Sequence, residues 1–397
     1  MITGRNILCI SSIDWDFIWQ GHQEIMARLA ANGNRVLFVD NTGVRKPGLR
    51  DLPRLRNRFR NWRRGTQGVR EEHRDLFVFA PVVLPLPYSR FAQRMNRWLI
   101  RRALARWMRT VEFDAPIVWT FLPTPLARGV IVDVDPSLVV YYCIDDFASS
   151  SREARRIRHS EEWVFREADL VFVTSEGLRD RASGLNPRVH VFPFGVDFDA
   201  FERARLSDHE VPAELAHLPR PIVGYIGGLH QYVDQSLVCA VAEAMPSASI
   251  VLVGPEQVDL SALRQHANVH LIGAREHAQL PRYIKAFDVG LVPYRLSDYT
   301  AHVYPTKLNE YLAMGIPVVS TDLHEIRQFV RRHGCVVAVA DSTDTFVAAV
   351  RRACEADDAA AEDRQIAVAR ENGWTARLEA MSALVEAALE ERAARRG

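Results

Sequence analysis

The sequence predicts an α/β protein made of two doubly wound domains, each built around a parallel sheet. Short β-branched apolar runs alternate with segments of helical periodicity along the chain, which is the pattern of βα units. The length of 397 residues exceeds the roughly 250–300 at which a single core stops growing. Five cysteines without C-x-x-C spacing and 48% hydrophobic residues favour two packed cores over a disulfide framework or a zinc site.

The expected strands fall into two series, with helices between most of them. The first series comprises Asn6–Ser11, Arg35–Asp40, Leu76–Ala80, Ile117–Phe121, Val139–Cys143, Leu170–Thr174 and His190–Phe194. The second comprises Ile222–Ile226, Ser249–Val253, Val269–Ile272, Val289–Val292, Val318–Ser320 and Val336–Val339. A polar, proline-containing connection near 203–220 separates the two series. We therefore expect domains over 1–205 and 206–375, and a C-terminal helix over 376–397 that can pack back on the first domain.

Two common nucleotide-binding motifs are missing from the sequence. No G-x-G-x-x-G follows the first strand and no G-x-x-x-x-G-K-[ST] occurs, which disfavours a nicotinamide dinucleotide site and a P-loop. Two tandem doubly wound domains instead predict a ligand in the cleft between the carboxyl ends of their strands. The N-terminal apolar run is too short for a signal peptide, and no run of about 18 apolar residues occurs, so we expect a cytoplasmic location.

The net charge of +1 conceals a strong asymmetry along the chain. Residues 1–110 contain 21 Lys/Arg and 8 Asp/Glu, a net of +13, and the remainder contains 29 and 41, a net of −12. Residues 45–70 carry ten basic residues and one acid, and residues 90–109 carry seven and none. The second stretch also contains apolar and aromatic residues, as interfacial helices do, so it predicts contact with an anionic membrane or a solvated basic helix face. Without a nucleic-acid module, we do not expect nucleic acid as a partner.

The segment "HVYPTKLNEYLAMGIPVVST", residues 302–321, places a lysine and a glutamate on one helix face. Lys307 and Glu310 are three residues apart, and such a surface pair contributes only about 0.2–0.5 kcal/mol. That interpretation leaves unexplained the proline at the helix start and the Gly-x-Pro turn that follows. The pair is therefore a candidate binding feature.

The second half of the chain resembles the GT-B glycosyltransferases, particularly family 4 and related bacterial polysaccharide glycosyltransferases. The similar segments are "FPFGVD", "GYIGGL", "VLVGP", "NVHLIGAREHAQLPRYIKAFDVGLVPY" and "PTKLNEYLAMGIPVVSTD". The resemblance implies two Rossmann-like domains facing a central cleft, with the acceptor bound by the first domain and a nucleotide-sugar donor bound by the second.

Residues of the second domain that match the family pattern are expected to bind the donor. The resemblance implies that Lys307 neutralises the donor diphosphate and that Glu310 accepts hydrogen bonds from the ribose. Retaining members usually have a glutamate eight positions before Glu310, where this chain has His302, which weakens the inference of retention. The full set of expected donor-binding residues is Gly227, Gly228, Arg275, Tyr294, His302, Thr306, Lys307 and Glu310.

Candidate catalytic bases lie in the first domain. Asp145 and Asp146 follow an apolar strand in "VVYYCIDDFASS", which resembles the segment that holds the base of the inverting xanthan glucuronosyltransferase. Because adjacent side chains point apart on an extended chain, only one is expected to act; a helix cap is the alternative. His22, near the aromatic loop "SSIDWDFIWQ", is a second candidate base.

These observations predict a glycosyltransferase that moves a sugar from a nucleoside diphosphate sugar, with UDP favoured, to a lipid-linked or surface-polysaccharide acceptor. We expect it to act at the inner face of the cell membrane, with no metal and no cofactor besides the donor substrate. Alternatives are a nucleotide-sugar epimerase of GT-B fold and a non-catalytic sugar-binding protein.

Overall fold

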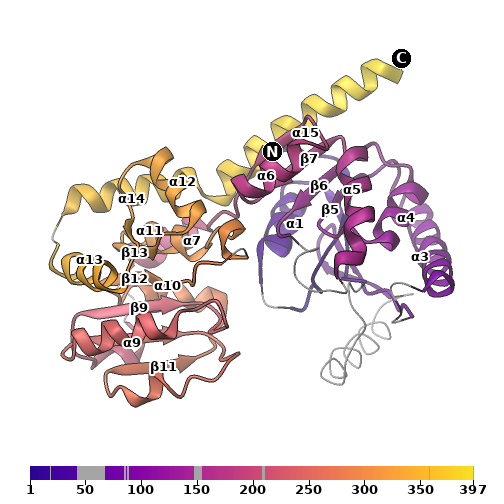
Figure 1. Cartoon of the computed structure of the whole chain (residues 1–397). Helices are drawn as coiled ribbons and strands as arrows, with labels where there is room; N and C mark the ends of the chain where they lie inside the picture. Colours follow the sequence, from indigo (N-terminus) through magenta and orange to yellow (C-terminus); the bar gives the residue numbers. More distant parts are fainter. Residues whose placement is uncertain are drawn as a thin grey trace. The chain divides into compact units, whose positions relative to one another are not determined.

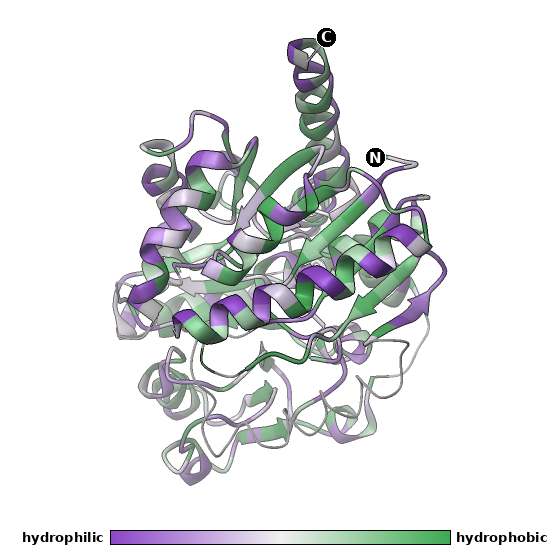
Figure 2. Cartoon of the chain, turned by 90° about the vertical axis from the view of Figure 1, so that its right-hand side faces the viewer, coloured by the Kyte–Doolittle hydropathy of each residue, from purple (hydrophilic) through white to green (hydrophobic). Residues whose placement is uncertain are grey.

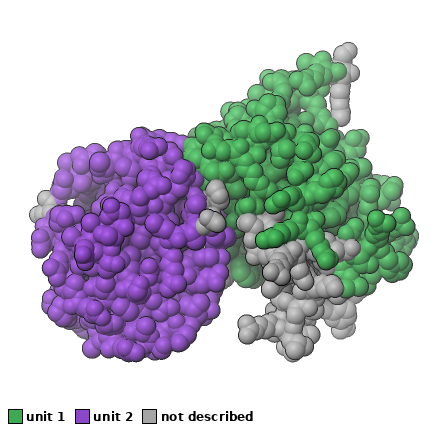
Figure 3. All heavy atoms as spheres, viewed as in Figure 1, with its two compact units in different colours: residues 1–192, 378–397 green, residues 193–377 purple. Residues whose placement is uncertain are grey.

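The computed structural model describes residues 1–17, 19–42, 68–84, 86, 89–146, 154–207, 211–297, 299–356 and 358–396. The chain divides into two compact units, Met1–Phe192 with Leu378–Gly397, and Pro193–Arg377 (Figure 3). The division lies earlier than the expected boundary between residues 205 and 206, because Phe198 and Phe201 pack in the core of the second unit.

The first unit contains one sheet in the order β3-β4-β2-β1-β5-β6-β7-β8 (Figure 1). Its strands are β1 (Asn6–Ile10), β2 (Arg35–Val39), β3 (Val69–His73), β4 (Leu76–Phe79), β5 (Ile117–Thr120), β6 (Leu138–Cys143), β7 (Leu170–Val173) and β8 (Val189–Val191). All neighbouring strands pair in parallel except β3 and β4. β3 was not predicted, because its sequence VREEH is polar. A strand at the edge of a sheet can keep most of its side chains exposed, so it lacks the apolar pattern of a central strand.

The helices of the first unit follow the strands as expected for βα units. They are α1 (Gly21–Ala31), α3 (Arg90–Thr110), α4 (Pro125–Val134), α5 (Arg158–Glu167) and α6 (Glu176–Ser183), with the 3₁₀ turn η3 (Ala154–Ile157). Local sequence explains several starts: the hydroxyl of Thr124 accepts the N–H of Ala127 ahead of α4, which has proline at its first turn.

The C-terminal helix α15 (Trp374–Arg396) ends in the first unit. Buried residues recur along it with helical spacing, at Leu378, Met381 and Val385. Near its end, Arg392 pairs with Asp169, the residue before β7, and Glu391 pairs with Arg188 at 2.6 Å. These contacts hold the helix on the first unit, although more than 180 residues separate it in sequence from Phe192, where the rest of that unit ends.

The second unit contains a sheet in the order β11-β10-β9-β12-β13-β14, and every pair in it is parallel. The strands are β9 (Ile222–Ile226), β10 (Ser249–Val253), β11 (Val269–Gly273), β12 (Val289–Val292), β13 (Val318–Thr321) and β14 (Ala338–Ala340). Figure 2 shows the strands as predominantly hydrophobic segments and the helices as mixed ones, because the helices cover both faces of each sheet.

The helices of the second unit complete its βα units. They are α7 (Phe198–Leu206), α8 (Ala213–Ala216), α9 (Gln235–Ala244), α10 (Leu280–Ile284), α11 (Lys307–Ala313), α12 (His324–His333), α13 (Thr343–Glu355) and α14 (Ala359–Glu371), with the 3₁₀ turns η4 (Leu263–Gln265), η5 (His277–Gln279) and η6 (Thr300–His302). In the described part of the chain, no helix combines the length and apolarity needed to cross a bilayer.

Both sheets contain a point where the strand order reverses. In the first sheet β1 pairs with β2 on one side and β5 on the other, and in the second sheet β9 pairs with β10 and β12. Doubly wound folds bind ligands at the carboxyl ends of the strands beside such a switch point. The fold therefore marks one place in each unit where functional side chains are expected.

Candidate functional site

The switch point of the second sheet lies between the ends of β9 and β12, which are followed by Gly227 and Pro293. Gly227 has φ +117°, a backbone conformation that residues with a Cβ rarely adopt. A Cβ placed on Gly254, at the end of the neighbouring β10, would lie 1.9 Å from the carbonyl oxygen of Gly227. The two glycines thus allow two strand ends to approach closely, and this leaves backbone at the surface of the switch point.

Lys307, the first residue of α11, lies beside this turn. Its ammonium nitrogen is 4.5 Å from the ring centroids of both Tyr225 and Tyr294. It donates hydrogen bonds to the Tyr294 hydroxyl and, at 3.4 Å, to the Tyr225 hydroxyl. A Cβ on Gly227 would lie 3.3 Å from the same nitrogen. The structure therefore brings together three of the predicted donor residues, Gly227, Tyr294 and Lys307.

The positive charge of Lys307 is held in place but is not neutralised. Only 7% of the residue is exposed, and among the residues that the structure describes none offers it a carboxylate within 4.0 Å. Burial raises the pKa of the Tyr225 hydroxyl well above its usual value, so this partner stays neutral. Aromatic faces stabilise a desolvated cation by about 2 kcal/mol without cancelling its charge. A buried, unneutralised cation favours binding of an anion.

Two further side chains complete this surface and were not predicted. Tyr225 donates from its hydroxyl to the Gly228 carbonyl at 3.0 Å, which fixes the glycine turn. His230 accepts the N–H of Tyr232 at Nδ1 over 3.2 Å, and burial together with the Lys307 charge lowers its pKa. Its neutral ring consequently carries the proton on Nε2. The segment "GYIGGLH" contains both residues, but only their tertiary contacts distinguish them from ordinary strand and loop residues.

Glu310 lies one turn after Lys307 on α11, with 13% of its side chain exposed. Its Oε1 lies 2.9 Å from Nε2 of His277. Thr306, which precedes α11, is exposed, and its side chain makes no capping hydrogen bond. The alternative interpretation of Lys307 and Glu310 as a surface ion pair finds no support among the described contacts, because each residue has other partners.

Arg275, one of the expected donor-binding residues, is engaged in a local network. Its Nε donates to the Tyr283 hydroxyl at 2.6 Å and its Nη2 to Glu214 at 3.1 Å. Hydrogen bonds from Tyr283, from the backbone of Glu214 and from Arg275 lower the pKa of the Glu214 carboxyl to about 2, so the network stays charged. These contacts hold the loop after β11. The side chain of His302 lies outside the described residues.

In the first unit, His22 lies at the corresponding switch point, between the ends of β1 and β5. It is fully buried, its Nε2 is 2.8 Å from the Ser12 hydroxyl, and its ring centroid is 4.2 Å from that of Phe121. Burial lowers the pKa of His22 to about 3. The imidazole is therefore neutral, and its protonation during a reaction would be unfavourable by several kcal/mol.

Asp145 and Asp146 follow β6, one strand further from the switch point. Asp146 pairs with Arg181 at 2.7 Å, and Arg181 also bonds the buried Glu161. One oxygen of Asp145 accepts the N–H of Asp146 at 2.8 Å. Asp146 is thus bound to a guanidinium, and the assignment of Asp145 as the base stays a prediction.

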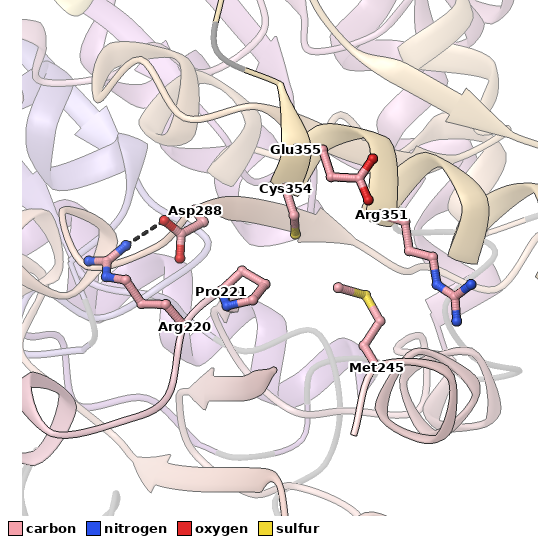
Figure 4. A pocket seen from close by; sticks show the side chains of 7 residues that line it. All are labelled: Arg220, Pro221, Met245, Asp288, Arg351, Cys354 and Glu355. Carbon is pink, nitrogen blue, oxygen red and sulfur yellow. Dashed lines mark hydrogen bonds and ion pairs between the residues drawn. The ribbon is translucent and has the colours of Figure 1, made fainter. Parts of the chain in front are cut away.

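A pocket of about 450 Å³ lies elsewhere in the second unit, at the amino ends of β9 and β12 (Figure 4). Both arginines of its lining have partners: Arg220 pairs with Asp288, and Nη2 of Arg351 donates to the Ala244 carbonyl at 2.5 Å. Burial raises the pKa of the Cys354 thiol to about 11, so the thiol is unreactive near neutral pH. The pocket contains none of the predicted site residues. The lining residues are Arg220, Pro221, Met245, Asp288, Arg351, Cys354 and Glu355.

Comparisons with known sequences identify the second unit. Residues 220–356 match the family model described as glycosyl transferases group 1. A Bacillus subtilis (strain 168) protein, provisionally named as the teichuronic acid biosynthesis glycosyltransferase TuaH, is 26% identical over 256 residues. That alignment covers 59% of this chain and 64% of the relative, so the chain spans less than two thirds of the relative it matches.

Solved structures extend the similarity to nearly the whole chain. Sucrose-phosphate synthase from Thermosynechococcus elongatus superposes with a TM-score of 0.68 at 16% identity, covering 96% of this chain and 98% of that one. HepE from Anabaena, in complex with UDP and glucose, gives 0.65 at 14% identity, covering 96% and 99%. These likenesses confirm the predicted fold of two Rossmann-like domains. The chain therefore has the GT-B fold and carries a glycosyl transferases group 1 domain in its second unit.

Proposed function

We propose that this protein is a glycosyltransferase that uses a nucleoside diphosphate sugar, with UDP as the favoured nucleotide. The observation that carries the proposal is the buried Lys307 ammonium group, which lies between two tyrosine rings at a strand-order switch point without a carboxylate partner among the described residues. A donor diphosphate has the charge that this site lacks. UDP is favoured because the structural neighbour HepE was solved with UDP.

The proposed reaction assigns one role to each candidate group. The acceptor hydroxyl oxygen attacks the anomeric carbon of the donor sugar while the bond from that carbon to the phosphate oxygen breaks. The bonding electrons leave with the nucleoside diphosphate, whose growing negative charge Lys307 stabilises. The acceptor proton passes to Asp145, and attack opposite the leaving group inverts the anomeric centre. Glu310 holds the ribose hydroxyls in place.

Nucleotide binding tests the donor site. We expect UDP to raise the melting temperature, because a ligand of the native state stabilises it by about 2.7 kcal/mol at a hundredfold excess over Kd. Turnover of UDP-sugars should then yield UDP and a glycosylated acceptor. If UDP, GDP, ADP, CDP and TDP all leave the melting temperature unchanged at millimolar concentration, the donor assignment is wrong. Release of an epimerised sugar without transfer would support an epimerase instead.

The proposed acceptor is lipid-linked or a surface polysaccharide, reached at an anionic membrane, and helix α3 supports this part of the proposal. Its buried residues lie on one face, and a second apolar stripe lies on the opposite, exposed face, where Phe91 is 70% and Trp98 54% exposed. Helix α3 lies on the side that faces the viewer in Figure 2, and hydrophilic and hydrophobic residues alternate along this helix. The residues of the exposed stripe are Phe91, Met95, Trp98 and Leu99.

Arginines flank this exposed stripe, as in helices that lie in a membrane interface. Arg102 lies 5.7 Å from the Trp98 ring. Arg97 differs from its neighbours because it forms a two-pronged pair with Asp133 of α4, at 2.8 Å for both bonds. Residues 45–67 of the other basic stretch lie outside the described residues. Helix α3 alone therefore provides the described part of the proposed membrane surface.

Vesicle co-sedimentation tests the membrane proposal. We expect binding to vesicles containing phosphatidylglycerol, where each basic residue contributes about 1 kcal/mol, and loss of binding as salt rises. Replacing Arg94, Arg101 and Arg102 together with glutamine should release the protein. Arg97→Gln is the matched control, because its charge is already paired with Asp133. If the wild type sediments with neither anionic nor neutral vesicles at low salt, the membrane proposal is wrong.

A further inference from the structure

A histidine that was not among the predicted site residues contacts the proposed ribose-binding glutamate. His277 is the first residue of η5, and its Nε2 lies 2.9 Å from Oε1 of Glu310 on α11. An ionised carboxylate can only accept hydrogen bonds, so the imidazole Nε2–H must be the donor. The contact therefore occupies Oε1 and restricts the rotation of the Glu310 side chain.

The loop that carries His277 is held by contacts of its own. On one side, Arg275 bonds to both Tyr283 and Glu214. On the other, Glu276 and Gln279 form a reciprocal capping box around η5. The ring of His277 also packs 6.5 Å from the buried Phe201 of α7. These contacts hold the backbone of the loop, and the His277 side chain remains 39% exposed, so the Glu310 hydrogen bond and the Phe201 ring are the contacts that orient the imidazole.

We propose that His277 is a positioning residue, which aims the Glu310 carboxylate at the ribose hydroxyls and thereby sets the preference for a ribonucleotide. The inference rests on the proposed function, because it assumes that Glu310 meets the donor ribose. Two groups lie 33 residues apart in sequence, and the hydrogen bond joins the β11–α10 loop to α11. In metal sites, residues that orient a ligating side chain by a hydrogen bond are worth roughly tenfold or more in affinity, and we expect an effect of that order here.

The effect should appear as selectivity rather than as general loss of binding. A site built to bond a hydroxyl discriminates strongly against the analogue that lacks it, because its own polar group is then left without a partner. If Glu310 is no longer aimed, UDP loses this bond, whereas 2′,3′-dideoxy-UDP has no hydroxyl to lose. Removal of His277 should therefore weaken UDP much more than the dideoxy nucleotide.

Calorimetric titration of the full chain with UDP and 2′,3′-dideoxy-UDP tests the proposal. We expect wild type to prefer UDP, and His277→Leu to reduce that preference roughly tenfold. His277→Gln should restore most of it, because the glutamine amide can donate to the same carboxylate oxygen. His266→Leu is the matched control. His266 also faces a glutamate, Glu243 at 3.9 Å, but it lies before the amino end of β11, whereas His277 follows the carboxyl end.

The possible outcomes are distinct. Equal weakening of both nucleotides in His277→Leu would mean that the residue only supports the fold, and an unchanged preference would mean that it has no role; either result overturns the inference. Failure of the wild type to bind UDP or any other nucleoside diphosphate would instead overturn the proposed function itself. Loss of preference that the glutamine variant restores supports the positioning role.

Discussion

The two sheets of this protein reverse their strand order in the same way, yet they place opposite chemistry at the reversal. At the end of β9, the second unit holds a cation, Lys307, between two tyrosine rings. At the end of β1, the first unit holds a neutral imidazole, His22, bonded to Ser12. One switch point thus carries a buried positive charge, and the other carries a neutral imidazole.

This difference matches the two substrates of the proposed reaction. A nucleoside diphosphate is anionic, and its charge grows as it leaves, so the site that binds it benefits from a fixed positive charge. A sugar hydroxyl is neutral until it loses its proton, so its site needs hydrogen bonds and a carboxylate such as Asp145. Shared topology therefore determines where a ligand binds, and the side chains at that place determine which ligand it is.

The largest effect is expected from Asp145→Asn, which would test the role of the first unit. Removal of a positioned base should lower transfer by roughly 10²–10⁴-fold, with UDP binding unchanged. Asp146→Asn is the matched control, because Asp146 is bound to Arg181 and its loss should reduce stability more than turnover. Rates and product configuration by NMR give the answer. Full activity of Asp145→Asn, or retention at the anomeric centre, would mean that Asp145 is not the base and has a structural role.

Lys307→Ala should have the next largest effect and tests the cation of the second unit. Loss of a group that stabilises developing charge costs about 10²–10³-fold in turnover, and donor affinity should fall less. Arg220→Ala is the control, since that cation is paired with Asp288 at the opposite edge of the sheet. Steady-state kinetics of both variants would be compared. Equal turnover in wild type and Lys307→Ala would mean that the Lys307 charge does not act on the leaving diphosphate, and the proposed functional difference between the two switch points would be wrong.

The smallest effect concerns the neutral imidazole of the first unit. The folded pKa of His22 is about 3, against an ordinary value of 6.5, so below pH 6.5 the unfolded chain binds a proton that the folded chain does not. The free energy of unfolding should therefore fall by about 1.4 kcal/mol for each pH unit below 6.5, down to about pH 3.

Urea unfolding of wild type and His22→Gln at pH 7.0 and 5.5 isolates this term. The glutamine variant should lose about 1.3 kcal/mol less than the wild type between these pH values, and well above pH 6.5 the two pH slopes should coincide. Identical slopes over the acidic range would mean that His22 is protonated in the folded protein, and the first switch point would then carry charge as well.

Much of the fold follows from local sequence. Apolar runs such as "IVGYI" and "SIVLV" are hydrophobic throughout because parallel strands are covered on both faces, and they form β9 and β10 as predicted. The polar strand β3 was missed for the same reason, since an edge strand lacks that signal. The motif around Lys307 was also recognisable, because neighbouring residues in one helix and turn carry it.

The sequence by itself determined the two α/β domains, the family resemblance and the segment that holds the candidate donor site. Only the tertiary structure decided which charges are already bound: Arg275 is engaged by Glu214, 61 residues away, whereas Lys307 meets two tyrosines, one of them 82 residues away. It also brought His277 to Glu310. The physical reason is that strand and helix patterns are set by neighbours in sequence, whereas the partner of a charge is set by packing between distant elements, which no local pattern specifies.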